Sequence, residues 1–362
     1  MELSEVIIDK IKNEGPIPFH DFMEMSLYYP GMGYYASAEE SIGTGGDFYT
    51  SPCLSPVFGA MVSRQLEEMW ALMGKCDFTV VEFGAGKGSL CGHIMQYIER
   101  TNPQLYGKLN YAIIEKSPSM RQHEQQCICR DKVCWYDSIH DMPQVQGCVI
   151  SNELVDNFAV HLVEMQDELM EVFVDYNDGF AERLKPAAET VKQYFAEQQI
   201  TLPRGFRTEV NLEATQWIQD VSRVLKKGYV LTIDYGYSST EMYNAQRSKG
   251  TLVCYNKHKV SAYPYSDIGR QDITAHVNFT ALHLWGQKNG LDLCGYTDQA
   301  RFLLSLGILD HLNRAGEIYG NSDREKEAFL KYALLVDMGR KFKVLIQGKD
   351  TPRQRLTGLM FA

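Results

Sequence analysis

The feature that most constrains this chain is an apolar run that ends in closely spaced glycines. Val80–Phe83 is predicted to be a buried β-strand, Gly84–Gly88 a turn, and Ser89 the start of a helix. A turn without Cβ atoms lets a ligand approach closely, as in the nucleotide-binding crevice of an α/β sheet. The glycines alone fit an ordinary strand-to-helix turn equally well. Glu115, which ends the next predicted strand about 30 residues on, favours a nucleotide site because such a carboxylate can bind both ribose hydroxyls.

The spacing of the glycines separates two cofactors. A dinucleotide fingerprint needs glycine at the sixth position of Gly-x-Gly-x-x-Gly, and counting from Gly84 that position holds Ser89. The observed spacing, with Glu82 before it, instead suits S-adenosylmethionine, whose ammonium and sulfonium a carboxylate attracts. A nicotinamide dehydrogenase is therefore disfavoured. The residues of this region that we expect to bind the cofactor are Glu82, Gly84, Ala85, Gly86, Gly88 and Glu115.

Charge and cysteine content narrow the classes of protein. The chain has 362 residues, of which 46 are acidic and 36 basic, and the net charge of -10 argues against a nucleic acid as the default partner. No apolar run approaches the ~20 residues of a membrane span. The first helix lacks the Arg-rich character of a transit peptide, so we expect a cytoplasmic protein. Cys127, Cys129 and Cys134 lack a paired second half with zinc-like spacing, so we expect buried thiols and no metal site.

Strands and helices alternate from residue 78 onward, which predicts an α/β fold with a parallel sheet and helices on both faces. Residues 1–75 are predicted to be an N-terminal helical cap with a cofactor-covering loop. Ser55 and Pro56 have the residue types of a helix start. Residues 76–362 are the predicted core, with insertions near 155–205, which begins as a β-hairpin over 160–176, and near 237–280. The predicted strands are 78–83, 110–115, 132–135, 147–151, 228–236, 291–296 and 341–347; the predicted helices are 88–100, 118–127, 189–199, 212–226, 280–289, 298–306 and 323–339.

A polar heptapeptide, Ser151–Asn157, begins where the fourth strand ends, at the edge where open α/β sheets bind ligands. If it forms one helical turn, Glu153 and Asp156 share a face and can grip one planar cation. Adjacent carboxylates repel each other, so such a pair needs a cation or a raised pKa. Asn152 is then expected to contact the cofactor. The alternative is a solvated turn that Asn152 caps.

Two further segments carry candidate polar groups. In Gly269–Phe279 every other residue is polar, which is typical of a strand or a loop in which Asp272, Thr274, His276 and Asn278 would face one side. His276 could accept a proton or orient the substrate. Asp47 and Thr50 lie in a glycine-rich stretch that could cover the cofactor, although its glycines also fit plain turns.

Taken together, these segments resemble the MidA-like S-adenosylmethionine-dependent methyltransferases, a family that includes the mitochondrial complex I assembly-factor arginine methyltransferase. Asn157 and Ala159 stand where the family usually has Ala and Pro, and Lys87 lies inside the glycine loop. The matching segments are collinear and span most of the chain: 15–19, 30–35, 46–51, 82–90, 115–118, 151–156, 233–236, 250–252 and 271–279.

The resemblance implies a seven-stranded Rossmann-like class I methyltransferase sheet. It also implies dimethylation of an arginine on a protein substrate, a respiratory complex I subunit, with a mitochondrial matrix location in organellar relatives. A guanidinium is a poor nucleophile until carboxylates draw positive charge to its other nitrogens, so Glu153 and Asp156 are the catalytic candidates. His276 would take the released proton or fix the substrate. Two alternatives stay open: methylation of a small metabolite, and a non-catalytic assembly protein that keeps the cofactor fold.

Overall fold

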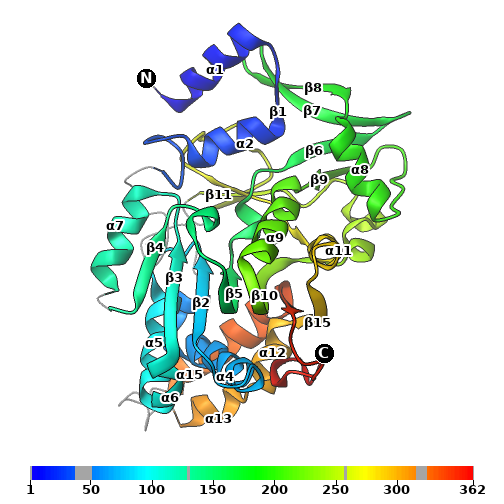
Figure 1. The fold of residues 1–362 in the computed structure, drawn as a ribbon. Helices are drawn as coiled ribbons and strands as arrows, with labels where there is room; N and C mark the ends of the chain where they lie inside the picture. Colours follow the sequence, from blue (N-terminus) through cyan, green and yellow to red (C-terminus); the bar gives the residue numbers. More distant parts are fainter. Residues whose placement is uncertain (1, 37–50, 129–130, 257–258, 315–323, 362) are drawn as a thin grey trace. The chain divides into compact units, whose positions relative to one another are not determined.

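The computed structural model describes residues 2–36, 51–128, 131–256, 259–314 and 324–361 (Figure 1). These residues form two compact units. The unit that we call the large-sheet unit draws on Tyr49–Leu154, Ile218–Gly236 and Trp285–Ala362. The other, the small-sheet unit, draws on Met1–Phe48, Val155–Trp217 and Tyr237–Leu284.

The large sheet confirms the predicted α/β class: seven strands run in the order β15, β16, β10, β5, β2, β3, β4, and the short strand β14 is an eighth that pairs with β10. The five strands from β10 to β4 are parallel, whereas β16 is antiparallel to β10 and to β15. The strands are β2 (Phe78–Phe83), β3 (Leu109–Ile114), β4 (Val133–Tyr136), β5 (Val145–Asn152), β10 (Leu225–Tyr237), β15 (Asp292–Asp298) and β16 (Phe342–Lys349).

The strand order reverses between β2 and β5. From β2 the chain moves outward to β3 and β4 and then returns to β5, on the other side of β2. Ligands of open α/β sheets bind beyond the carboxyl ends of the strands at such a reversal. In the register of the sheet, Phe83 lies beside both Ile114 and Ser151. The glycine loop and Glu115 therefore follow the ends of the neighbouring strands β2 and β3, and Asn152 is the last residue of β5.

Two glycines set how closely β2, β5 and β10 approach. A Cβ on Gly147 would lie 2.0 Å from the carbonyl oxygen of Thr79, and one on Gly228 would lie 1.9 Å from that of Gly147. Their φ angles of 149° and 140° are also ones that other residues rarely adopt. Any side chain at Gly147 or Gly228 would therefore push these strands apart.

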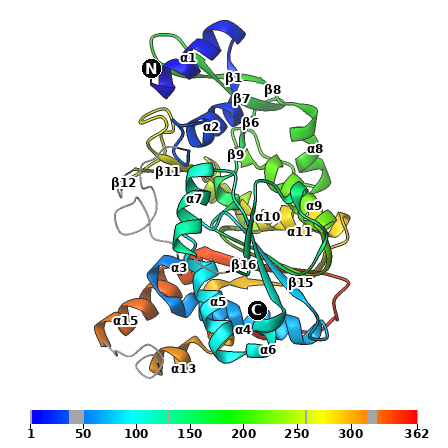
Figure 2. The ribbon, with the colours of Figure 1, turned by 60° about the vertical axis from the view of Figure 1, so that its left-hand side comes forward.

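Helices α4 and α5 lie side by side and share one apolar core with the large sheet (Figure 2). Alternate strand residues such as Val80, Tyr111 and Ile150 belong to that core, as the two-residue period of a strand requires. As predicted, α4 begins at Ser55 and Pro56, where the Ser55 hydroxyl accepts a hydrogen bond from the Val57 amide (3.3 Å).

The other elements with most or all of their residues in the large-sheet unit are α3 (Ser51–Leu54), α4 (Pro56–Leu72), α5 (Ser89–Thr101), α6 (Pro103–Lys108), α7 (Pro118–Cys127), η1 (Ile139–Asp141), α12 (Gln299–Ser305), α13 (Ile308–Asn313), α15 (Arg324–Tyr332), the π-helix η4 (Ala333–Asp337), α16 (Met338–Lys341) and η5 (Thr357–Leu359). Helices α9 (Leu212–Val224) and α11 (Phe279–Lys288) contribute residues to both units.

The small-sheet unit contains two antiparallel sheets. In the first, β1, β7, β6 and β9 run in that order and β8 pairs with β7; in the second, β11 lies between β12 and β13. The pairing of β6 with β7 confirms the predicted hairpin. Helices α1 and α2 pack against β7 (Figure 1). The elements are α1 (Leu3–Glu14), β1 (Ile17–Pro18), α2 (Phe19–Tyr28), η2 (Val155–Asn157), β6 (His161–Met165), β7 (Leu169–Tyr176), β8 (Phe180–Pro186), α8 (Glu189–Glu197), β9 (Arg207–Val210), α10 (Ser239–Met242), η3 (Ala245–Arg247), β11 (Val253–Asn256), β12 (Lys259–Ser261), β13 (Asp272–Thr274) and β14 (Val277–Asn278).

Two expectations need correction. The polar face expected over Gly269–Phe279 does not form, because the strand breaks between β13 and β14 and nearly all of the segment is buried. Cys127 and Cys134 are exposed rather than buried, and Cys129 lies outside the described residues. Within the described ranges, no helix has both the length and the apolar character to cross a bilayer.

Candidate active site

The glycine loop joins β2 to α5 in a conformation that glycine favours. Gly84, Gly86 and Gly88 all have positive φ angles, and Gly84 is exposed. At Gly88 the left-handed backbone (φ 71°) caps the start of α5, and a Cβ there would lie 2.4 Å from the Ile128 side chain. Ala85 packs against the core. The loop is thus fixed on its inner side and open at Gly84.

Glu115 stands at the carboxyl end of β3, as predicted. Its Oε1 accepts a hydrogen bond from the Ser117 amide (2.7 Å), which orients the carboxylate. Partial burial raises the pKa of Glu115, while the same amide opposes the rise. Ser117 also caps α7 through its hydroxyl, so one short turn both ends the strand and holds the acid.

Glu82 lies beneath the loop and not on its surface. Only 3% of the residue is exposed, and its Oε2 accepts a 2.5 Å hydrogen bond from the Tyr111 hydroxyl. Burial raises the pKa of Glu82 to about 7, against the effect of Tyr111. Its predicted contact with the cofactor stays a prediction, and any effect of its charge would act through the loop.

A third carboxyl near this edge, that of Glu124, was not anticipated from the sequence. It is fully buried on α7, and its Oε2 accepts a hydrogen bond from the Trp135 indole nitrogen (2.9 Å). Burial, and next the charge of Glu115, raise the pKa of Glu124 to about 8. The sequence signal was weak, because an acid in a polar helix is usually exposed.

Asn152 is the last residue of β5, and Glu153 follows it. Asn152 Nδ2 donates to Glu153 Oε1 (3.1 Å), and so does the Ser51 amide (3.3 Å). Glu153 has a φ of 53°, a left-handed conformation that is uncommon outside glycine. Two hydrogen bonds from backbone amides hold this turn: Glu153 N donates to the Ile233 carbonyl oxygen (3.0 Å), and Leu154 N donates to the Asp234 carboxylate at Oδ2 (3.2 Å).

The helical turn expected over Glu153–Asp156 does not form. The 3₁₀ helix η2 begins only at Val155, so Glu153 precedes it. Asp156 belongs to the small-sheet unit and is only 3% exposed. Its carbonyl oxygen accepts a hydrogen bond from the Ala275 amide (3.0 Å), which places the backbone of η2 beside the residue that precedes His276.

Two tyrosines accompany Asp156 in the small-sheet unit, and sequence reasoning missed them. The rings of Tyr28 and Tyr35 stack with centroids 5.6 Å apart, and the Tyr28 hydroxyl donates to Asn157 O (3.0 Å). Burial first, and then nearby charges that include Asp156 and the 2% exposed Asp272, raise the pKa of both hydroxyls. Two buried carboxylates therefore act on the same pair of aromatic residues.

His276 is a neutral imidazole at neutral pH. Burial first, and then the positive charge of Arg247, lower its pKa to about 4. The rings of His276 and Tyr237 have centroids 5.1 Å apart. The Arg247 guanidinium carbon lies over the Tyr237 ring, 3.8 Å from its centroid. The His276 amide donates to the Thr251 hydroxyl (3.1 Å).

Two predicted cofactor residues, Asp47 and Thr50, lie outside the described residues, so their roles stay predictions. In the part of the chain that the structure describes, no three histidine, cysteine, aspartate or glutamate side chains are grouped as metal ligands.

Comparison with known families gives a match over residues 61–297, to the family described as "Putative S-adenosyl-L-methionine-dependent methyltransferase". Among solved structures, a COG1565 superfamily member from Burkholderia thailandensis, bound to S-adenosyl-homocysteine, is 32% identical with a TM-score of 0.89. The match covers 98% of this chain and 94% of that chain.

The chain is also similar to curated proteins named protein arginine methyltransferase NDUFAF7, mitochondrial. The Homo sapiens protein is 27% identical, over 96% of this chain and 83% of its own length. The Bos taurus protein is 26% identical, over 97% and 84%.

Proposed function

This chain belongs to the S-adenosyl-L-methionine-dependent methyltransferase family that matches residues 61–297, and we propose that it methylates an arginine side chain of a protein. The family and the similarity to the Burkholderia thailandensis protein establish S-adenosyl-L-methionine as its cofactor. When bound, that cofactor supplies an electrophilic methyl group.

The residues at the edge of the large sheet fit this cofactor. Gly84 is an exposed residue of the glycine loop, and the oriented Glu115 carboxylate suits ribose hydroxyls. Asn152 Oδ1 is a buried acceptor without a hydrogen-bond partner among the described residues, so it can receive a donor from the ligand. We propose Gly84, Ala85, Gly86, Gly88, Glu115 and Asn152 as the residues that hold the cofactor, with Glu82 beneath them.

The observation that carries the arginine proposal is the group of Asp156, Asp272, Tyr28 and Tyr35. Both aspartates are buried and both lie within electrostatic range of the tyrosine pair. A guanidinium is a permanent, planar cation that forms hydrogen bonds to carboxylates and stacks on aromatic rings. This chemistry supports arginine over an uncharged metabolite.

Glu153 is proposed to polarise the guanidinium. A carboxylate near two of its nitrogens draws positive charge away from the third, which becomes a better nucleophile. The strained backbone of Glu153 supports a functional role, because such conformations cluster at functional sites. Asp156 is proposed as a second catalytic carboxylate.

His276, neutral at the pH of the cell, can accept a proton from the substrate or hold it by a hydrogen bond. The protein substrate is proposed to be a respiratory complex I subunit, as the family resemblance in the sequence implies. The cytoplasmic location stays a prediction.

The direct test is labelling of native lysate, from a strain that lacks this protein, with an isotopically labelled methyl donor. The proposal expects a labelled protein band in which mass spectrometry places the methyl groups on arginine. Label that passes a protein-retaining filter would identify a small-molecule methyltransferase. Absence of cofactor binding by calorimetry would identify a scaffold protein.

The role of Glu153 is tested by Glu153→Gln, which keeps the shape of the side chain. Turnover should fall by about 10²–10³-fold, as on loss of one charge-stabilising group, while cofactor affinity stays unchanged. Glu99→Gln, on an exposed position of α5, is the matched control. Equal turnover in the two variants would remove Glu153 from the mechanism. Asp156→Asn and His276→Gln test the other two assignments in the same assay.

A further inference from the structure

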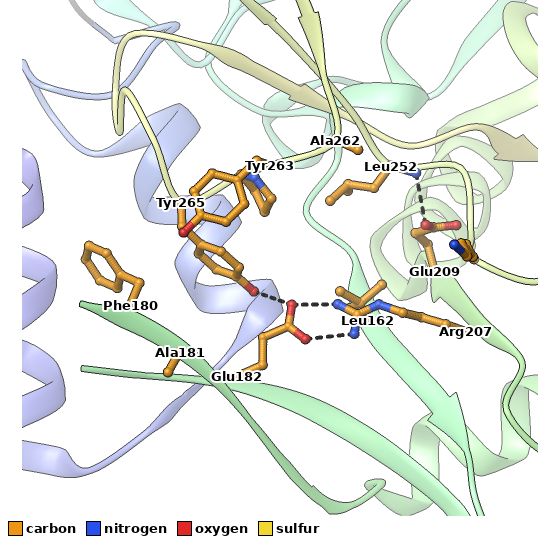
Figure 3. A pocket seen from close by; sticks show the side chains of 12 residues that line it. Leu162, Phe180, Ala181, Glu182, Arg207, Glu209, Leu252, Ala262, Tyr263 and Tyr265 are labelled. Carbon is orange, nitrogen blue, oxygen red and sulfur yellow. Dashed lines mark hydrogen bonds and ion pairs between the residues drawn. The ribbon is translucent and has the colours of Figure 1, made fainter. Parts of the chain in front are cut away.

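The small-sheet unit contains a cavity of about 310 Å³ that the roles above do not use (Figure 3). Its walls come from strands β6 and β9, from the first residues of β8, and from the two segments 249–252 and 262–265. The volume is at the lower end of the range for small-ligand pockets and suits one bulky side chain with its backbone.

The charged groups of this cavity largely satisfy one another. Arg207 makes two hydrogen bonds to Glu182 (2.7 and 2.6 Å), and the Tyr265 hydroxyl makes a third (2.8 Å). Figure 3 shows the Glu182 carboxylate between these two donors. The buried Glu209 carboxylate accepts bonds from Thr251 and Leu252. A charged ligand group would have to compete with these bonds, so the cavity favours an apolar occupant.

The remaining walls are apolar and continuous with the core of the unit. Leu162 belongs to that core, and Phe180, Leu252 and Tyr265 pack against it. Tyr263 is 56% exposed, and its ring meets that of Tyr265 at 5.5 Å. An apolar side chain placed here would extend the core and cover exposed aromatic surface.

Two features next to the cavity indicate which ligand it suits: a strand edge that fits an extended peptide, and a lysine that fits an acidic residue. Strand β12 pairs only with β11 among the described residues, its side chains are exposed, and Ala262 and Tyr263 follow it directly. A free strand edge of this kind can accept a further strand. At the rim, Lys249 is exposed and has no acidic partner in the described part of the chain. Its charge is complementary to an acidic residue.

Hydrogen bonds also connect the cavity wall to His276, which is proposed to act on the substrate. The Thr251 hydroxyl donates to Glu209 Oε2 (3.0 Å) and accepts from the His276 amide (3.1 Å). Thr251 therefore links Glu209, in the wall of the cavity, to the backbone of His276.

We propose that this cavity is a docking pocket for the protein substrate: it receives a bulky apolar side chain of an extended segment that carries an acidic residue nearby. The inference rests on the proposed function in taking the substrate to be a protein. It adds a specificity determinant outside the cofactor edge of the large sheet.

The test uses the full chain without cofactor and short fluorescent peptides with a Gly-Ser-Asp background. One peptide has a central Phe, and its partner has Ser at that position. The Phe peptide should bind at least about tenfold more tightly by fluorescence anisotropy, a difference of about 1.4 kcal/mol. Equal binding of the two peptides would overturn the proposal. Free indole that binds as tightly as the Phe peptide would show a small-molecule pocket and overturn it too.

Ala262→Trp fills the cavity and should abolish the preference for Phe. Leu309→Trp, which adds the same ring to an exposed position of α13, should keep it. If the Ala262 variant fails to fold by circular dichroism, the exposed Tyr263→Ser decides, and it should weaken the Phe peptide about tenfold. Unchanged Phe binding in the folded variant would refute the pocket.

Lys249→Glu should weaken peptides with Asp but not those with Gly in its place, and an equal effect on both would refute the acidic preference. Because these peptides contain no arginine and the assay contains no cofactor, failure here is separate from failure of the methylation test.

Discussion

At the scale of single residues, the buried carboxyl groups set an unusual response to pH. The folded state holds the proton of Glu124 up to about pH 8, because of burial and the charge of Glu115, whereas the ordinary value is 4.5. Between these values the folded state binds one proton more than the unfolded state. The contribution of Glu124 to stability is therefore complete below its ordinary pKa of 4.5, and it is lost as the pH rises through its folded-state pKa of about 8.

Glu124→Gln should remove this dependence while it keeps an acceptor for Trp135. In the parent protein the single group lowers the free energy of unfolding by about 1.4 kcal/mol per pH unit within that window. Urea denaturation at several values between pH 5 and 8 measures it, and Glu99→Gln is the control. Parallel pH profiles for the parent and the Gln variant would contradict the assignment. Glu82, with its pKa raised to about 7, should contribute in the same direction over a narrower window.

Glu115 is the residue at which cofactor affinity should be most sensitive. A hydrogen bond to a charged group contributes about 1.5–3 kcal/mol, so Glu115→Gln should weaken S-adenosyl-homocysteine binding about 10- to 100-fold. Calorimetry measures the affinity directly. Glu213→Gln, in the small-sheet unit, should leave it unchanged. An unaltered affinity in the Glu115 variant would show that Glu115 does not bind the ribose.

At the scale of elements, the junction of β2 and α5 depends on the backbone of Gly88. Gly88→Ala should destabilise the protein by about 1–2 kcal/mol from its left-handed φ alone, and more because Ile128 must move. Gly92→Ala, in the same helix with open space at its Cβ position, should be neutral or stabilise by up to about 1 kcal/mol. Thermal unfolding compares the two. Equal effects would mean that the loop tolerates a side chain.

The elements of the large sheet could be predicted because their local signals agree. Buried parallel strands are continuous apolar runs, and the helices between them carry caps such as Ser55. The predicted bounds of β2 and α7 match the observed ones. Short elements of the small-sheet unit, such as β9, β13 and β14, were missed or merged, because two to four residues carry no readable period.

The candidate site could be predicted only where the chain itself brings residues to a strand end. Glu115 and Asn152 follow from the strand order, since parallel strands end at one edge. The left-handed Glu153 could not be foreseen, because tertiary hydrogen bonds to Ser51 and Leu154 hold that turn. Tyr28 and Tyr35 were missed for a related reason: residues far apart in sequence meet them.

At the scale of the whole molecule, bound ligand should stabilise the fold by mass action. A ligand at about one hundred times its dissociation constant adds about 2.7 kcal/mol to the free energy of unfolding if it binds only the folded state. S-adenosyl-homocysteine should therefore raise the melting temperature in proportion to the logarithm of its concentration. The Glu115→Gln variant should need a correspondingly higher concentration for the same rise. A melting temperature independent of ligand would contradict cofactor binding to the folded chain.

The division into two units has a consequence for how the protein is made. The polypeptide passes from one unit to the other five times, and the small-sheet unit takes its last residues from Tyr237–Leu284. A ribosome releases the chain from its first residue onward, so α1 and α2 emerge long before their partners do. Most of the protein must be synthesised before either half can close, and nascent chains of this enzyme should depend on chaperones that shield them during translation.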